Sequence, residues 1–123
     1  MIQDGKVWLV RHTYIPGWFM PGGGLKRGET LEQAARREAQ EETGAHLNEV
    51  TLMGVYTSFV DWKTDHGIVF ICKDFKITGQ PDGEIAEVRA FALNQLPEDL
   101  WSSHRLRLQE YAAGISQPQF GEW

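Results

Sequence analysis

Apolar and β-branched residues gather in short runs along this chain, and turn-forming residues separate the runs. Runs rich in Val, Ile, Thr, Tyr and Phe favour strands, because β-branched and aromatic side chains pack well on a pleated surface. The sequence therefore predicts strands over residues 6–12, 50–60, 67–77 and 87–93. The polar stretch 61–66 is predicted to join the second strand to the third.

The beginning of the sequence predicts a hairpin with a very short first strand. Asp4-Gly5 suits a two-residue type I′ turn, because glycine accepts the positive φ that this turn demands. Only residues 1–3 precede the turn, so the first strand is short or truncated. An incomplete strand leaves backbone groups of its neighbour unpaired. We therefore expect a homodimer as a candidate assembly, in which a second copy covers that sheet edge.

A helix is predicted over residues 31–43. Thr30 stands three residues before Gln33, which is the pattern of a capping box. The helical stretch contains no glycine or proline until Gly44, which supplies a C-cap residue.

A second helix is predicted between Pro97, near its start, and Gly114, at its end. Its apolar face would consist of Leu100, Leu108, Tyr111 and Ala112. Few signals of regular structure follow, so we expect the tail 116–123 to be loosely held.

Length and composition place these elements in one domain. A chain of 123 residues fits a single compact domain, since domains cluster near ~100–150 residues. The 41% hydrophobic and 24% charged residues are ordinary globular values. Strands mixed with helices, without an internal repeat, predict one α+β domain over residues 1–123. Cys72 is the one cysteine, and its apolar surroundings in the sequence predict a buried thiol.

Charge narrows the range of partners. A formal net charge of −5 gives no attraction to a polyanion, so a long nucleic acid or an anionic membrane is not expected. An acidic chain that acts on phosphates needs a metal ion. The first residues form neither a signal peptide nor an apolar span, and we expect a cytoplasmic protein that does not enter membranes.

The predicted first helix carries three carboxylates on one face. With ~100° of rotation per residue, Glu38, Glu41 and Glu42 fall within an arc of about 100°. Like charges at this spacing repel, so the cluster needs either a cation or a fully solvated surface. Mg²⁺ is the natural cation, because it prefers carboxylate and carbonyl oxygens and bridges them to phosphates. The alternative is an ordinary solvated face that Arg36 and Arg37 neutralise.

The loop before the helix favours the metal site. Gly22, Gly23 and Gly24 can bring bare backbone up to a metal–phosphate complex, because no side chain keeps a ligand away. Loop and helix together therefore predict a phosphate-processing site.

The segment 23–45 resembles the box of the Nudix hydrolase family, G-x5-E-x7-R-E-U-x-E-E-x-G-U, in which U is aliphatic. The matching residues are Gly23, Glu29, Arg37, Glu38, Ala39, Glu41, Glu42, Gly44 and Ala45. Alanine, which is smaller than usual, fills both aliphatic positions. Pro21-Gly22-Gly23 before it, and residues 87–91 before Leu96-Pro97, extend the resemblance over most of the chain.

The resemblance implies a Nudix-type α/β/α sandwich with a mixed β-sheet and an enzyme that cleaves a diphosphate bond with Mg²⁺ or Mn²⁺. It implies that the metal is held by Glu38, Glu41, Glu42 and a backbone carbonyl of Gly22 or Gly23. Glu29 and Arg37 would support these ligands, and Arg37 can pair with Glu41 four residues later.

The general base is predicted less specifically than the metal ligands. Glu41 is the first candidate, and Glu84 and Glu87 are alternatives from outside the helix. For the latter two, the competing interpretation is that they are simple surface acids beside a turn.

Candidates for substrate contacts lie outside the box. Trp18, Phe59, Trp62 and Trp101 can stack on a base, and Arg11 lies shortly before the glycine loop. Packing alone is the alternative for each aromatic residue.

The short chain resembles compact MutT-like members, which hydrolyse nucleoside triphosphates to monophosphate and pyrophosphate. Other candidate substrates are ADP-ribose, a nucleotide sugar, a dinucleoside polyphosphate or a capped RNA 5′ end. A hypothesis of another class is a non-catalytic Nudix-like ligand sensor or interaction module. The intact set of Glu38, Glu41 and Glu42 argues against it.

Overall fold

The computed structural model describes residues 1–123, apart from the side chain of Asp61. One sheet has the strand order β1-β2-β5 and another has the order β4-β3-β6. The strands are β1 (Ile2–Gln3), β2 (Lys6–His12), β3 (Ala45–Ser58), β4 (Asp65–Ile77), β5 (Ile85–Ala92) and β6 (Gln119–Glu122). The helices are α1 (Leu31–Thr43), the 3₁₀ turn η1 (Val60–Trp62) and α2 (Ser102–Ala113).

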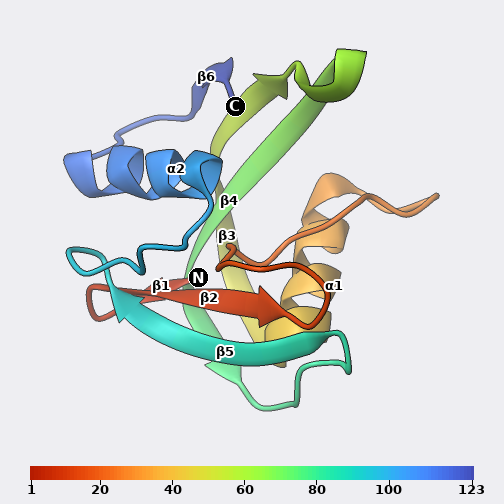
Figure 1. Ribbon diagram of the computed structural model, residues 1–123, viewed down its shortest axis with the longest axis vertical. Helices are drawn as coiled ribbons and strands as arrows, with labels where there is room; N and C mark the ends of the chain where they lie inside the picture. The colour runs from red at the N-terminus through yellow and green to blue at the C-terminus, as the bar shows by residue number, and fades with distance from the viewer.

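Figure 1 shows α1 and α2 on opposite sides of the strands, with the long β3–β4 hairpin running between them. Strand β3 pairs antiparallel with β4 and parallel with β6, so its sheet is mixed. The predicted α+β sandwich with a mixed sheet is confirmed.

The predicted N-terminal hairpin is present, with a two-residue first strand. Asp4 and Gly5 have φ values of 53° and 73°, as a type I′ turn requires. Strand β1 covers only the first part of the β2 edge. Further along the same edge, Phe19 exchanges two backbone hydrogen bonds of 2.9 Å with Val10. The edge that suggested a partner chain is therefore partly covered from within the chain, and the homodimer stays a prediction.

Helix α1 is capped as predicted. The Thr30 hydroxyl accepts a hydrogen bond from the Gln33 backbone, and the Gln33 side chain accepts one from the Thr30 backbone. Gly44 ends the helix with φ 74°, and a Cβ there would collide with the backbone of Gly79. The Gly44 carbonyl accepts hydrogen bonds from the N–H groups of Thr78 and Gly79. The turn after β4 is thereby held against the end of α1.

Strands β3, β4 and β5 begin earlier than predicted, at their N-terminal ends. Strand β3 begins at Ala45, directly after the α1 cap, and its first residues pair with Phe75 to Ile77 of β4. Polar, exposed residues such as His46 interrupt the apolar run there, so pairing rather than composition decides the boundary. Strands β4 and β5 also begin two residues early, at Asp65 and Ile85.

The second helix begins later than predicted, at Ser102 rather than near Pro97. Trp18 donates a backbone hydrogen bond to Asp99 and accepts one from Trp101, so Leu100 lies in a parallel bridge instead of a helical turn. Leu100 is still a core residue, but Ala112 is exposed and does not belong to the apolar face.

The tail was predicted to be loosely held, and this is wrong. Residues 119–122 form β6, which pairs in parallel with Gly54–Thr57 of β3. The signal was missed because the side chains of β6 are exposed and its pairing partner lies far away in the sequence.

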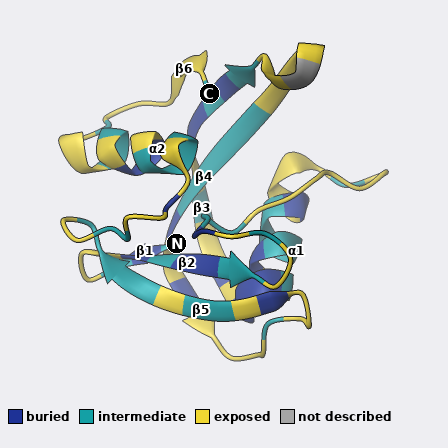
Figure 2. Ribbon diagram, viewed as in Figure 1, coloured by how far each residue is buried: buried dark blue, intermediate teal, exposed yellow. Residues whose placement is uncertain are grey.

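The core consists of separate clusters of buried hydrophobic residues. Figure 2 shows the buried parts of the chain in dark blue. One cluster contains Ile2, Val7, Leu9, Trp18, Leu100 and Leu108. The other contains Ala39, Ala45, Leu47, Cys72 and Phe75, and Cys72 is a buried free thiol, as predicted. Within the described residues, no helix is both long and apolar enough to span a membrane.

Candidate active site

Arg37 is the centre of a hydrogen-bonded network on α1. Its Nε and Nη2 donate to the two oxygens of Glu29, at 2.6 and 3.0 Å. Its Nη1 donates to Glu38 at 2.9 Å and to Glu41 at 3.2 Å, and Nη2 also donates to the Gly24 carbonyl at 2.9 Å. One guanidinium therefore orients two carboxylates of the acidic face and fixes the glycine loop to the helix.

The fork between Arg37 and Glu29 keeps both groups charged. The hydrogen bond from Arg37 lowers the pKa of Glu29 to about 2, with a further contribution from the backbone N–H of Lys26. The same contact raises the pKa of Arg37. Arg37 and Glu29 are thus both charged at neutral pH.

Glu42 is the buried member of the acidic face, with 5% of its surface exposed. Its carboxylate accepts a hydrogen bond of 3.0 Å from the backbone N–H of Gly22. Burial raises the pKa of Glu42 to about 7; the Gly22 N–H opposes this shift, and the charges of Glu38, Asp82 and Glu41 add to it. The carboxylates lie close enough to repel one another, so a bound cation would relieve the repulsion.

The glycine loop touches the acidic face at Gly23. A Cβ at this position would lie 2.6 Å from Cδ of Glu38, whereas a Cβ at Gly22 or Gly24 meets nothing within 4 Å. The backbone of Gly23 therefore lies directly against the Glu38 carboxylate. Only glycine allows this approach without displacing Glu38.

The donors of this site fit a hard divalent cation. Carboxylates and loop carbonyls are the ligands that Mg²⁺ and Mn²⁺ prefer. Among the described residues, no group of three His, Cys, Asp or Glu side chains converges on one point. The reason is visible in the contacts: Arg37 holds Glu38 and Glu41, while the Gly22 N–H holds Glu42. The fit therefore rests on donor chemistry and on the closeness of the three carboxylates.

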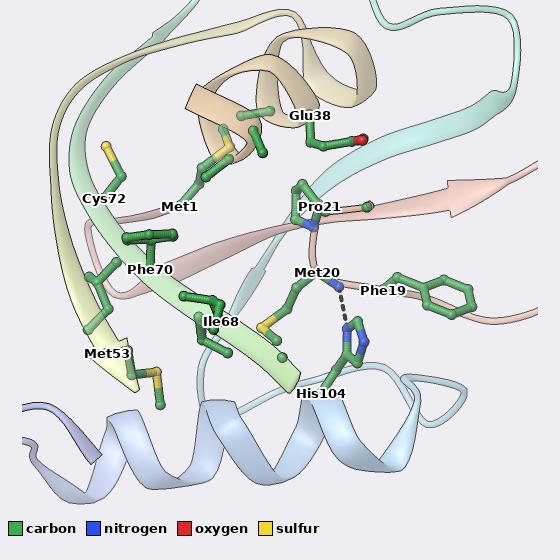
Figure 3. A pocket seen from close by; sticks show the side chains of 18 of the residues that line it. Met1, Phe19, Met20, Pro21, Glu38, Met53, Ile68, Phe70, Cys72 and His104 are labelled. Atoms are coloured by element: carbon green, nitrogen blue, oxygen red, sulfur yellow. Dashed lines mark hydrogen bonds between the residues drawn. The ribbon is translucent and has the colours of Figure 1, made fainter. Parts of the chain in front are cut away.

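A cavity of about 750 Å³ opens beside Glu38, the member of the acidic face that lines it among the described residues. Glu38 and the glycine loop line one end, and the face of β4 that carries Ile68, Phe70 and Cys72 lines one side (Figure 3). Met20 and His104 approach from the other side, as Figure 3 shows. A diphosphate at Glu38 would therefore have a largely apolar space beside it for the group that it carries.

The residues predicted to contact the substrate do not line this cavity. Trp18 is 2% exposed and packs edge-to-face on Phe91 in the core, so no face of its ring is free. The guanidinium of Arg11 lies 4.6 Å above the Trp18 ring and pairs with Asp99 at 3.7 Å. Core packing therefore accounts for Trp18 and for the position of Arg11.

The remaining predicted aromatics are outside the cavity too. Trp101 donates its indole N–H to the Pro16 carbonyl. Phe59 and Trp62 lie at the tip of the β3–β4 hairpin, where Phe59 is 61% exposed and Trp62 is fully exposed. Of the described residues that line the cavity, none is Arg11, Trp18, Trp62 or Trp101.

The acids predicted as alternatives from outside the helix lie in β5 and directly before it. Glu84 is exposed, and the Glu87 carboxylate pairs with Arg89. Asp82, which no sequence pattern singled out, donates its backbone N–H to the Glu41 carbonyl at 2.8 Å. Its charge also acts on Glu42. The turn Pro81-Asp82-Gly83 was the available signal, but only the contact with α1 distinguishes Asp82 from its neighbours.

His104 binds the backbone of Met20, just before the glycine loop. Its Nδ1 accepts a hydrogen bond of 2.8 Å from the backbone N–H of Met20, drawn as a dashed line in Figure 3. The imidazole packs against Phe19, and burial lowers the pKa of His104 to about 4. The neutral ring is therefore the form that this contact requires.

We expect His104 to contribute a loss of unfolding free energy as the pH decreases from 6.5 towards 4, because the unfolded chain then binds a proton on His104 that the folded chain excludes. The contribution of His104 is complete above pH 6.5 and its loss amounts to about 3 kcal/mol. Glu42, whose pKa is raised to about 7, acts in the opposite direction over the same range, because the folded chain takes up its proton first. The His104 contribution is therefore measured as the difference between the parent protein and His104→Asn, which keeps an acceptor for Met20 but cannot titrate, in urea titrations at several pH values. His46→Asn, at an exposed site, should match the parent protein, and equal pH dependence in all three proteins would contradict the assignment.

Comparison with known proteins gives consistent matches. A family model described as the NUDIX domain matches residues 1–111. An ADP-ribose pyrophosphatase of Methanocaldococcus jannaschii is 34% identical over 114 residues, which are 89% of this chain and 67% of that protein. The 8-oxo-dGDP phosphatase NUDT18 of Homo sapiens is 30% identical over 104 residues, or 81% of this chain and 31% of that protein. The chain thus spans about two thirds of the first relative and less than one third of the second.

The fold has solved counterparts as well. The crystal structure of a MutT NUDIX hydrolase from Burkholderia pseudomallei superposes with a TM-score of 0.75 at 27% identity. The superposition covers 89% of this chain and 90% of that chain. The glycine loop and the acidic face of α1 lie inside the matched residues 1–111.

Proposed function

Because this chain belongs to the NUDIX domain family, we propose that it is an enzyme that hydrolyses a diphosphate bond in a small nucleotide-like substrate. The observation that carries the proposal is the acidic face of α1, where Glu38, Glu41 and Glu42 lie beside a glycine loop at the end of the cavity. Non-catalytic binding modules have no need of three carboxylates held in this way, which disfavours a sensor or interaction module.

Glu38, Glu41 and Glu42, with a backbone carbonyl of Gly22 or Gly23, would hold the divalent cation, Mg²⁺ or Mn²⁺. When bound, such an ion neutralises phosphate oxygens and lowers the pKa of a coordinated water. In this proposal Arg37 and Glu29 are positioning residues, which act by keeping Glu38 and Glu41 in place.

Glu41 is the first candidate for the general base. Its side chain is 41% exposed, whereas that of Glu38 is 15% exposed, so Glu41 has the freer access to water. Glu84 and Glu87 stay alternatives from outside the helix, and Asp82 joins the set because of its charge interaction with Glu42.

For the substrate, we propose a nucleoside triphosphate, hydrolysed to monophosphate and pyrophosphate in the MutT manner. Support comes from the likeness over nearly the whole chain to the solved MutT hydrolase. ADP-ribose is the second candidate, and it is favoured by the relative of that activity, which matches 89% of this chain. We also propose that residues 1–123 form a single domain, since α2 and β6 both pack on the elements of the matched region.

The test is release of phosphate and pyrophosphate from a panel of nucleoside triphosphates, oxidised nucleotides, ADP-ribose, nucleotide sugars and dinucleoside polyphosphates. Each substrate is assayed with Mg²⁺, with Mn²⁺ and with a chelator. We expect hydrolysis of at least one member and its loss in the chelator. If the folded protein, supplied with metal, releases neither phosphate nor pyrophosphate from any substrate of the panel, the proposal is overturned.

A further inference from the structure

We propose that β6 is a strap that holds Trp123, the residue directly after it, in the wall of the substrate cavity, and that Trp123 selects substrates by stacking on a flat aromatic group such as a nucleobase. This inference rests on the proposed function, because it assigns a role to one wall of the same cavity. It concerns a part of the chain that lies beyond residues 1–111, which match the family.

Trp123 lines the cavity that also contains Glu38 and the glycine loop. Its ring lies 5.5 Å from the ring of His104, which holds Met20, and 5.9 Å from the ring of Tyr56. Trp123 therefore stands on the wall that faces away from the acidic helix, where the group carried by a diphosphate would extend.

The strap is held mainly through its backbone. Strand β6 pairs with Gly54–Thr57, and the N–H of Trp123 donates to the Thr57 carbonyl at 2.8 Å. All four residues of β6 are exposed, and Phe120 is 90% exposed. Burial of strap side chains therefore does not explain why the segment docks here.

A buried arginine fixes the end of the strap. Arg107 is 4% exposed and donates to the Glu122 carbonyl at 3.1 Å and to Glu110 at 3.0 Å. Its guanidinium lies 4.0 Å from the centre of the Tyr56 ring and 5.3 Å from the centre of the Trp123 ring. The cation–π contact with Arg107 therefore fixes the orientation of the Trp123 indole.

A glycine makes room for the pairing of β6. A Cβ at Gly54 would lie 2.6 Å from the carbonyl oxygen of Gln119, and would block this pairing. At Gly67 of β4, which faces the indole, an added Cβ would lie 3.4 Å from the Trp123 ring, in ordinary van der Waals contact. The indole therefore packs close to the backbone of β4 without requiring glycine there.

The surroundings of Trp123 select a particular kind of ligand group. Met20, Ile68 and the neutral ring of His104 share the cavity with the indole, and they offer apolar or aromatic contact rather than an array of hydrogen bonds. Stacking of a nucleobase on an aromatic side chain does not depend strongly on which base is present. We therefore expect Trp123 to favour substrates that carry a base over diphosphates that carry only aliphatic or sugar groups.

The test is steady-state kinetics of Trp123→Ala, Trp123→Leu and Trp123→Phe with the best substrate of the panel. Loss of stacking should raise KM by about 5- to 150-fold in the Ala and Leu variants. We expect kcat to change little, because the indole does not touch the acidic face, and Phe should restore most of the affinity. Phe120→Ala, on the outward side of the same strap, is the matched control and should leave KM unchanged.

Leu retains apolar bulk, so it separates stacking from filling of space, and thermal melting shows that each variant is folded. Unchanged KM in folded Trp123→Leu and Trp123→Ala, with an active parent protein, would overturn the role of Trp123 but leave the proposed function intact.

A second readout does not depend on turnover. The chain has five tryptophans, and Trp123→Phe identifies the indole N–H resonance of Trp123 in an NMR spectrum by its disappearance. Titration with AMP, GMP, CMP and UMP, which carry a base but no diphosphate bond, should shift this resonance. If none of the four nucleotides shifts it, the stacking role is overturned, whereas an inactive parent protein with a shifted resonance overturns only the proposed hydrolysis.

Discussion

Replacement of Glu41 by glutamine is expected to lower kcat by about 10²- to 10⁴-fold, the usual loss when a positioned acid–base group is removed. The substitution removes a charge at constant size, and the Glu41 side chain is 41% exposed, so we expect the domain to stay folded. The Arg37 guanidinium retains its contacts with Glu29 and Glu38, which preserves the rest of the network. Assays at saturating substrate with Mg²⁺ or Mn²⁺, together with thermal melting, measure both effects.

Glu32→Gln on the same helix is the matched control. Glu32 lies in an exposed ion pair with Arg36 at 3.7 Å, and a pair of this kind contributes at most about 1 kcal/mol to stability. Its kcat should equal that of the parent protein. If Glu41→Gln retains near-parental activity, the proton-accepting and metal-holding roles of Glu41 are both contradicted.

Local signals predicted much of the fold. The capping box of Thr30 and Gln33, the positive φ at Gly44 and the turn at Asp4-Gly5 depend on neighbours in the sequence, and all are present. The later start of α2 depends instead on the bridge between Trp18 and Leu100, whose partners are distant in the sequence. Pairing across such distances leaves no periodic pattern in either segment, so a single sequence does not reveal it.

The candidate site divides in the same way. Spacing along one helix predicted the clustering of Glu38, Glu41 and Glu42, because helical geometry alone fixes which side chains share a face. The cavity wall was missed, since Met20, His104 and Trp123 meet only after α2 and β6 dock. Aromatic character by itself predicted Trp18, which the structure uses in the core.

The glycine loop offers the second large effect. Gly23→Ala is expected to lower kcat by about 10²-fold, because a displacement of about 1 Å in a catalytic group can cost that much. The added Cβ would lie 2.6 Å from Cδ of Glu38, and the flexible carboxylate can move away more easily than the backbone. Gly23 does not have a positive φ, so alanine fits the backbone conformation. The loss should therefore appear in catalysis and in metal affinity, with little change in melting temperature.

Gly24→Ala is the control for this substitution, because it makes the same chemical change one residue later. A Cβ at Gly24 meets nothing within 4 Å, and Arg37 contacts only its carbonyl oxygen, which alanine retains. We expect parental kcat and parental Mg²⁺ dependence in this variant. Equal activity of Gly23→Ala and Gly24→Ala would mean that the Glu38 carboxylate need not lie against the loop during turnover. The two alanines therefore separate a general need for loop flexibility from a specific need for space at Glu38.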